Sequence, residues 1–497
     1  MPIAPSLGSL SPSWPGLSRP SNSSRGLRVS SKLTDVDARD KPGHDGKGNG
    51  PVLAYCDLVY MKARTGGTML GWMRTAGLAM AGLGVVSALP AMAAEDTIKI
   101  GVLHSLSGTM AISETTPKDT VLMLVDDLNK HGGLLGKKVE AVVVDPASNW
   151  PLFAEKAREL ISKDHVAVVF GCWTSVSRKS VLPVFEELNG LLFYPVQYEG
   201  EESSRNVFYT GAAPNQQAIP AVEYLMSKEG GDVKRWVLAG TDYVYPRTTN
   251  KILEAFLKSK GVAQEDIMIN YTPFGQSDWQ TIVADIKKFA SAGKKTAVVS
   301  TINGDANVPF YKELANQGIK AKDTPVVAFS VGEEELAGID TKNLVGHLAA
   351  WNYFESVKGP ENAAFIKEWH DYIKNDKRTT NDPMEATYIG FHMWTQAVLQ
   401  AGTTDIDAVR QAMIGQKVKA PSGFQAIMNS NHHLSKPVMI GEIQPTGQFD
   451  IVWQTKEPIK ADAWSKYIPE SAKLTADWTF PWVCGNCTEP KYGSYEH

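Results

Sequence analysis

Hydrophobic positions from residue 97 onward follow two alternating spacings. Short, almost wholly apolar runs occur at 98–103, 138–144 and 166–170, and the segments between them repeat apolar residues every three or four positions. The runs are typical of strands buried on both faces of a parallel sheet, and the spaced segments are typical of helices. Proline favours the first turn of a helix, so we expect helices to begin at Pro117 and Pro151.

The strand-and-helix alternation occurs twice along the chain. It predicts two doubly wound, Rossmann-like α/β lobes. Ligands of such sheets bind beyond the carboxyl ends of the strands, so binding residues are expected in the loops that follow them. The remaining expected strands are 191–195, 207–211, 236–240, 268–271, 296–301 and 325–329, and the remaining expected helices are 175–188, 250–260, 278–290 and 309–317.

Length and charge narrow the class of protein. The chain has 497 residues, 43% of them hydrophobic, which is more than one core needs, so two or more domains are expected. The 50 Lys and Arg against 54 Asp and Glu give a formal charge of −4. A basic surface for nucleic acid is therefore not expected.

Residues 69–94 have the pattern of a secretory signal peptide. Arg74 precedes an apolar run of small residues and Leu, and Ala91-Met92-Ala93 fits a cleavage site. The alternative, a retained membrane helix, is disfavoured because the run 75–89 is Gly-rich and shorter than the roughly 20 residues needed to span. We expect a signal peptide at 69–93 and a mature protein in the periplasm, without stable membrane insertion.

The stretch before this signal is not expected to fold. Residues 1–60 are rich in Ser, Pro and Gly and show no helical or strand periodicity. A signal peptide has to lie near the N-terminus, so we expect residues 1–68 to be disordered and to result from a start codon placed too early. Met61 or Met69 is the expected start, and a genuine disordered tail is the alternative.

Cysteines outside the leader suggest a link near the C-terminus. Cys484 and Cys487 are separated by two residues, a spacing that suits a disulfide, a redox pair or half of a metal site. No second pair follows, which disfavours metal, since zinc usually takes four ligands. We expect a disulfide that pins a C-terminal extension at 466–497, with free thiols as the alternative.

Motifs for cofactor chemistry are absent from the sequence. It contains no G-x-x-x-x-G-K-[ST], G-x-S-x-G or H-E-x-x-H, and no G-x-G-x-x-G after a strand. An amide hydrolase using Cys172 or Ser175 is a remote alternative, because no spacing pairs either residue with His104. His432 and His433 are expected in a solvated loop. We therefore expect no enzyme, no cofactor and no metal.

Three loops that follow expected strands are rich in hydroxyl and aromatic side chains. They are 171–179, 194–200 and 241–247. The first of them begins a helix, where Thr174 or Ser175 can cap the helix and free backbone N–H groups can receive an oxygen atom. Because all three loops follow strand ends, they suggest an enclosed site for a small flat ligand.

Long runs around these loops identify a resemblance. FGCWTSVSRKSVLPVFEELNGLLFYPVQYEGEESSRNVFYTGAAPNQQ and GTDYVYPRTTN resemble the substrate-binding components of urea ABC transporters, within the type I periplasmic binding protein family that includes short-chain amide receptors. The resemblance covers residues 97–482. It implies a protein that captures urea or a small amide and delivers it to an inner-membrane ABC permease and its ATPase. The alternative is that the protein acts as a periplasmic sensor rather than in transport.

The resemblance also implies a hinged architecture. Two lobes joined by three crossovers would close on the ligand. The crossovers are expected near 212–215, 349–354 and 421–424. Lobe 1 would then comprise 97–213 and 352–423, and lobe 2 would comprise 214–350 and 424–465.

Seven pocket residues follow from the resemblance. Urea is planar and neutral, with one carbonyl and four N–H donors, so its site needs mostly acceptors. Ser175 would serve the carbonyl, Asp305 would accept from the amino groups, and aromatic rings would cover the faces. Short-chain amide receptors carry other residues at Trp173, Val196 and Gln197, which favours urea over another short amide. The expected ligand-binding residues are Trp173, Ser175, Tyr194, Tyr198, Tyr243, Tyr245 and Asp305.

Overall fold

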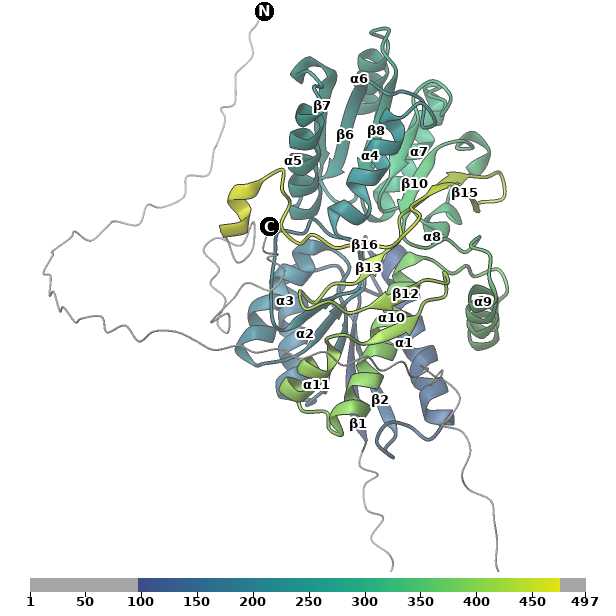
Figure 1. The fold of residues 1–497 in the computed structure, drawn as a ribbon. Coiled ribbons are helices and arrows are strands. Elements are labelled where there is room, and N and C mark those ends of the chain that lie inside the picture. Colours follow the sequence, from purple (N-terminus) through teal and green to yellow (C-terminus); the bar gives the residue numbers. More distant parts are fainter. Residues whose placement is uncertain (1–96, 474–497) are drawn as a thin grey trace, which may run out of the picture. The chain divides into compact units, whose positions relative to one another are not determined.

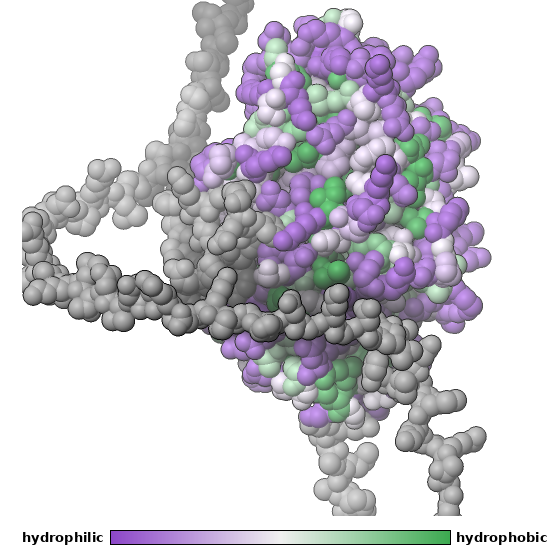
Figure 2. Space-filling view, viewed as in Figure 1, coloured by the Kyte–Doolittle hydropathy of each residue, from purple (hydrophilic) through white to green (hydrophobic). Residues whose placement is uncertain are grey.

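The computed structural model describes residues 97–473, which form two large sheets flanked by helices and two small two-stranded sheets (Figure 1). The expected leader with its signal peptide, and both Cys484 and Cys487, lie outside the described residues. None of the helices within 97–473 combines the length and apolar character needed to cross a bilayer. On the face shown in Figure 2, hydrophilic side chains predominate and apolar ones occur in small separate groups.

The first sheet has five parallel strands in the order β2-β1-β3-β4-β5. Successive residues of a strand point to opposite faces, so Val102 packs under α1 and α10 whereas Leu103 packs under α2 and α3. We call this sheet, its helices and the hairpin β11–β12 the first lobe. Its elements are β1 (Ile98–Leu103), α1 (Ala111–Lys130), β2 (Val139–Val144), α2 (Trp150–Ser162), β3 (Val169–Gly171), α3 (Ser175–Glu187), β4 (Leu192–Tyr194), β5 (Val207–Tyr209), α9 (Pro360–Ile373), α10 (Asp382–Ala401), α11 (Ile406–Met413), β11 (Lys417–Lys419) and β12 (Gln425–Ile427).

The second sheet has seven strands in the order β15-β14-β10-β9-β8-β6-β7. The five from β10 to β7 are parallel, and β14 and β15 are antiparallel additions. Helices α4 and α5 cover one face, and α6 and α7 cover the other. We call this sheet with its helices the second lobe. Its elements are α4 (Ala218–Met226), β6 (Arg235–Thr241), α5 (Val244–Ser259), β7 (Ile267–Thr272), α6 (Gln280–Ala290), β8 (Thr296–Thr301), α7 (Asn307–Asn316), β9 (Val326–Ala328), α8 (Glu333–Leu336), β10 (Leu348–Trp351), β14 (Met439–Ile443) and β15 (Phe449–Gln454).

The predicted fold class, two doubly wound α/β lobes, is confirmed by these two sheets. One predicted helix start is confirmed and one is wrong. Pro151 lies in the first turn of α2, where the Asn149 side chain caps the helix by accepting from Leu152 N at 3.0 Å. Pro117 lies inside α1, six residues after its first residue Ala111. Tertiary contacts extend α1 backward, since Glu114 is buried and accepts from Ser105 N at 2.7 Å.

The chain passes between the lobes three times. The first passage lies between β5 and α4, and the second between β10 and α9. The expected third crossover at 421–424 is instead the turn of the hairpin β11–β12, because Val418 and Ala426 on its strands pack in the core beneath α10. The chain leaves that core after Leu434 and enters the second sheet at Met439, so the third passage runs through β13 (Ser435–Lys436).

Residues 459–471 contact both lobes. β16 (Ile459–Lys460) pairs with β13 between the two sheets (Figure 1). Glu201 of the first lobe accepts from Ser465 N at 2.6 Å and from the Ser471 hydroxyl. The Tyr467 ring meets Phe256 of α5 edge-on, with centroids 5.3 Å apart. The beginning of the expected C-terminal extension is therefore packed against the lobes. Short 3₁₀ helices are η1 (Pro214–Gln216), η2 (Gln264–Asp266), η3 (Gly304–Ala306), η4 (Thr341–Asn343) and η5 (Pro469–Lys473).

Candidate ligand-binding site

The start of α3 places Trp173 and Ser175 in the interior, 3% and 1% exposed. Thr174 caps the helix by accepting from Ser177 N at 3.1 Å, which leaves the neighbouring Ser175 hydroxyl for other partners. That hydroxyl donates to the Glu199 carboxylate and accepts from Arg178 Nη1 at 3.1 Å. The helix start thus holds Ser175 against a buried acid rather than against its own backbone.

An ion cluster lies directly behind Ser175. Arg178 donates from Nη2 to Glu199 Oε1 at 3.0 Å and from Nε to Glu202 Oε1 at 2.8 Å, and Lys179 donates to Glu202 Oε2 at 2.9 Å. Arg178, Glu199 and Glu202 are fully buried. Burial opposes the charge on Glu202, but Arg178 and Lys179 outweigh it and hold the pKa of that carboxyl well below its usual range. The cluster therefore fixes Glu199 as a buried carboxylate beside the loop that follows β4.

Aromatic rings enclose this cluster. The Arg178 guanidinium lies 4.6 Å from the ring centroid of Tyr194 and 4.7 Å from that of Tyr198. Tyr194 donates its hydroxyl to the backbone carbonyl of Trp173, which ties the ends of β3 and β4 together. Tyr198 stacks on Tyr209 with centroids 4.9 Å apart. Three tyrosine rings of the first lobe, Tyr194, Tyr198 and Tyr209, therefore lie around one guanidinium.

The two histidines expected in a solvated loop are buried instead, so that prediction is wrong. The segment that carries them docks along β5, where Tyr209 N donates to His432 O at 2.9 Å. The His433 ring stacks on Tyr209 at 4.5 Å and forms a hydrogen bond through Nε2 with the Tyr198 hydroxyl. Burial lowers the pKa of His432 to about 3 and that of His433 to about 4, so both rings are neutral at physiological pH.

The second lobe contributes Tyr243 and Tyr245 from the loop after β6 and the first turn of α5. Their side chains are 7% and 2% exposed and pack against Val176 of α3, in the first lobe. Burial raises the pKa of Tyr243, and the negative charge of Glu199 in the first lobe raises it further. These interactions place the second-lobe tyrosines close to the first-lobe cluster.

Six of the seven expected pocket residues are thus buried around one junction between the lobes. Asp305 does not lie among these buried residues, and its expected role as an acceptor for the ligand stays a prediction. It lies in η3 with an exposed side chain, and its backbone N–H donates to Thr109 O at 3.2 Å. An exposed carboxylate keeps its water, so it gains little by receiving a ligand's N–H groups.

Glu199 is a buried carboxylate among these residues that the sequence prediction did not include. The sequence places it in the aromatic loop 194–200, between Tyr198 and Gly200. An acid in a loop usually faces water, so the pattern alone gave no sign of burial. Its partner Arg178 is 21 residues away, and only the pairing of β3 with β4 brings the two together.

Neither Cys172 nor Ser175 is paired with His104. Burial raises the pKa of the Cys172 thiol. His104, the histidine of the candidate loops, bonds through Nδ1 to Glu114 Oε2 at 3.2 Å rather than to Cys172 or Ser175. Within residues 97–473, no group of three or more His, Cys, Asp or Glu side chains is arranged to hold a metal ion.

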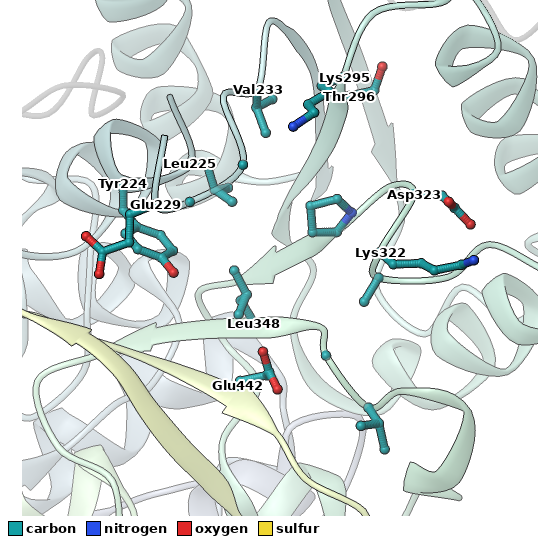
Figure 3. A pocket seen from close by; sticks show the side chains of 16 residues that line it. Tyr224, Leu225, Glu229, Val233, Lys295, Thr296, Lys322, Asp323, Leu348 and Glu442 are labelled. Atoms are coloured by element: carbon teal, nitrogen blue, oxygen red, sulfur yellow. The ribbon is translucent and has the colours of Figure 1, made fainter. Parts of the chain in front are cut away.

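An open cavity of about 420 Å³ occurs elsewhere in the second lobe. Figure 3 shows Tyr224, Glu229, Lys295, Lys322 and Glu442 around it. Thr296 and Leu348, the first residues of β8 and β10, also line it, so it lies at the amino ends of the parallel strands. Tyr243 and Tyr245 follow the carboxyl end of β6, which is the edge where ligands of such sheets bind.

The two α/β lobes carry buried polar groups at the carboxyl ends of their strands. Residues 98–470 match the periplasmic binding protein domain family. The chain belongs to this family.

Curated relatives agree over most of their length. The Leu/Ile/Val-binding protein homolog 7 of Brucella melitensis biotype 1 is 24% identical over 365 residues, which are 69% of this chain and 88% of that protein. A Geobacillus stearothermophilus protein named limonene hydroxylase is 35% identical over 121 residues, but these span 24% of this chain and 22% of that protein. Because this match covers so small a part of the Geobacillus protein, it gives no evidence that this chain shares the named activity.

Solved structures share the fold. A solute-binding protein of an ABC transporter from Rhodopseudomonas palustris HaA2, in complex with p-hydroxybenzoic acid, matches with a TM-score of 0.64 and 23% identity, covering 74% of this chain and 98% of that one. A leucine-binding protein from Thermotoga maritima MSB8 matches with a TM-score of 0.61 and 16% identity, covering 72% and 98%. The expected type I periplasmic binding protein fold is therefore confirmed.

Proposed function

We propose that this protein is a periplasmic solute-binding protein that captures urea and delivers it to an ABC permease and its ATPase. The observation that carries the proposal is the buried junction between the lobes. There, the Glu199 carboxylate is held by Ser175 and Arg178 and is flanked by tyrosines from both lobes. A buried carboxylate accepts hydrogen bonds, and the amino groups of urea donate them.

The charge of the junction favours a neutral ligand over an acid. Amino acids and aromatic acids both present a carboxylate, which needs a buried cation to bind. At this junction the Arg178 guanidinium is already bonded to Glu199 and Glu202, and Lys179 is bonded to Glu202. A ligand carboxylate would therefore compete with two protein carboxylates, whereas an uncharged amide would not.

The flat aromatic surroundings favour a small planar molecule. Trp173, Tyr194 and Tyr198 lie at the ends of the first-lobe strands, and Tyr243 and Tyr245 lie across the junction. Aromatic rings pack on the faces of a planar ligand and need no hydrogen bonds there. Hydroxyl and carboxylate groups form hydrogen bonds with its edges. Urea fits this description, because its hydrogen-bonding groups all lie at its edges.

A thermal-shift panel of urea, thiourea, acetamide, formamide, leucine and 4-hydroxybenzoate tests the proposal. A ligand at 100 times its dissociation constant stabilises the folded state by about 2.7 kcal/mol. Urea is also a denaturant, but at concentrations below about 10 mM its destabilising effect is below about 0.03 kcal/mol. We expect urea to raise the melting temperature at low concentration. A shift with leucine or 4-hydroxybenzoate, and none with urea, would contradict the proposal.

Export through the signal peptide is part of the proposal. Ala91-Met92-Ala93 predicts a mature protein that begins at Ala94 or Glu95. N-terminal sequencing of periplasmic material checks this start. A sequence beginning upstream of residue 75 would contradict both the cleavage and the expected start codon.

A further inference from the structure

A turn of unusual backbone conformation lies inside the loop that carries Glu199. Gly200 and Glu201 have φ values of 69° and 57°, in the left-handed region that favours glycine. A glutamate rarely adopts this conformation, and it keeps it only where surrounding contacts hold it there. The residues on either side of this turn, Glu199 and Glu202, both bond to Arg178. The conformation of Glu201 therefore bears directly on the candidate site.

The contacts that hold Glu201 come from far along the sequence. Its backbone N–H donates to Ala463 O at 2.5 Å, and its carboxylate accepts from Ser465 N at 2.6 Å and from the Ser471 hydroxyl. Glu201 is fully buried, and these three partners are buried around it. We call residues 461–471 the bridging segment. This segment fixes both the backbone and the side chain of Glu201.

The bridging segment also contacts the second lobe, and Figure 1 shows it, in yellow, beside α5. The Tyr467 ring meets Phe256 of α5 edge-on, with centroids 5.3 Å apart, and packs against the core beneath α4 and α5. Glu470 forms an ion pair with Lys251 of the same helix at 3.6 Å. Tyr245 lies in the first turn of α5. The bridging segment therefore connects the left-handed turn of the first lobe to the helix that carries Tyr245.

We propose that Glu201 is a positioning residue: by anchoring the bridging segment, it holds Glu199 in place for the ligand and couples the binding loop of the first lobe to α5 of the second. The inference rests on the proposed function, in which Glu199 accepts hydrogen bonds from urea. Glu201 acts through Glu199 and through the bridging segment, and not by contact with the ligand.

The coupling has a physical reason in the movement of the lobes. Hinge closure moves α5 relative to the first lobe, and a segment attached to both lobes keeps all its contacts in only one relative arrangement. A ligand that binds Glu199 and the second-lobe tyrosines together favours that arrangement and thereby tightens the bridging segment. Hydrogen exchange in the segment should then respond to the ligand, although none of the expected ligand-binding residues lies in it.

The competing interpretation is that the bridging segment is a structural staple without influence on binding. Three substitutions separate the interpretations. Glu201→Gly removes the carboxylate and suits the left-handed φ, so it tests the anchor without adding backbone strain. Ser471→Ala removes one donor to the carboxylate and keeps Glu201. Glu470→Gln is the matched control, because its ion pair with Lys251 joins side chains that are 65% and 53% exposed and should contribute little.

Two measurements on the full chain are combined. Calorimetric titration with urea gives the dissociation constant. Hydrogen–deuterium exchange with mass spectrometry follows peptides from the bridging segment with and without urea, with peptides from α9 as an internal reference. In the unsubstituted protein we expect saturating urea to slow exchange in the bridging segment by about threefold or more relative to that reference.

The variants should differ in both measurements. Glu201→Gly should weaken urea binding by about tenfold and abolish the slowing by urea, because without its anchor the loop holds Glu199 in its binding position in only a minority of molecules. Ser471→Ala should weaken binding by about threefold, since the bond to Ser465 N remains. Glu470→Gln should leave both measurements unchanged.

The outcomes separate the inference from the proposed function. If urea slows exchange in the loop 194–202 of the unsubstituted protein but not in the bridging segment, the inference is wrong although the proposed function stands. That result needs no variant, so a variant that fails to fold does not protect the inference. Unchanged urea affinity in Glu201→Gly also overturns it, whatever the stability of the variant. The absence of urea binding by the unsubstituted protein overturns the proposed function itself.

Discussion

Each lobe contributes buried polar groups to the junction. The two sets differ in the hydrogen-bond partners that these groups have. In the first lobe, Arg178, Glu199 and Tyr194 all have hydrogen-bond partners within their own lobe. In the second lobe, the hydroxyls of Tyr245 and Thr249 are buried without hydrogen-bond partners among the described residues. The ion cluster of the first half is therefore closed on itself, whereas the second half presents buried hydroxyls.

This difference gives a physical reason for closure. A ligand favours the closed state only by interacting better with it than with the open state. A ligand seated on the first lobe bonds to Glu199 there, and it gains further hydrogen bonds when the second lobe arrives. We therefore expect the ligand to favour hinge closure.

The largest expected effect comes from removing the cation of the buried ion cluster in the first lobe. Arg178→Gln leaves Glu199 and Glu202 buried without their shared cation, which should lower the free energy of unfolding by about 3 to 5 kcal/mol. Guanidinium chloride unfolding followed by circular dichroism measures the change. Arg247→Gln is the matched control, because its ion pair with Asp242 at 2.5 Å is 40% and 44% exposed and should matter little. Equal effects of the two substitutions would contradict a structural role for the buried cluster.

The second-largest expected effect tests which carboxylate, Glu199 or Asp305, binds the ligand. Glu199→Gln keeps the size of the side chain and removes its charge, which should weaken urea binding by about tenfold to a hundredfold because charge-assisted hydrogen bonds are lost. Asp305→Asn is the control, and it should leave affinity nearly unchanged because Asp305 is exposed. Calorimetry on both variants decides between them. Loss of binding in Asp305→Asn with normal binding in Glu199→Gln would favour the expectation drawn from the family resemblance.

The smallest effect contrasts one tyrosine from each half. Tyr194→Phe removes a hydroxyl that donates to Trp173 O, and it should cost about 0.5 to 1.5 kcal/mol of stability without ligand. Tyr245→Phe removes a hydroxyl without a partner, so the ligand-free protein should be as stable as before or slightly more stable. Chemical unfolding of both variants without ligand measures the contrast. A loss in Tyr245→Phe as large as that in Tyr194→Phe would show that the two halves do not differ.

Elements with strong local signals were predictable from the sequence. The strands Ile98–Leu103 and Thr296–Thr301 have the predicted bounds, because long apolar runs need no tertiary context to be recognised. The start of α1 was not predictable, since it depends on the burial of Glu114 against residues before the helix. The hairpin β11–β12 has a Pro-Ser-Gly turn that looks like a linker, and only its packing beneath α10 assigns it to the first lobe.

The candidate site also has parts that the sequence predicted and parts that it did not. The loops that carry Trp173, Tyr194 and Tyr243 follow strand ends and were predictable from the alternation of strands and helices. The partners within the site were not, because Glu199 meets Arg178, and Gln197 meets Ser330, across distances in sequence that no periodicity encodes. Asp305 was expected from a resemblance alone, and its exposure depends on how η3 turns after β8.

A crystal structure of the protein grown with urea tests the central claim most directly. We predict one planar molecule enclosed between the lobes, with a nitrogen atom within about 3.2 Å of the Glu199 carboxylate. The side chains of the first lobe should keep the contacts described above. A junction that holds only water at saturating urea, or urea bound in the open cavity at the amino ends of β8 and β10, would contradict the account.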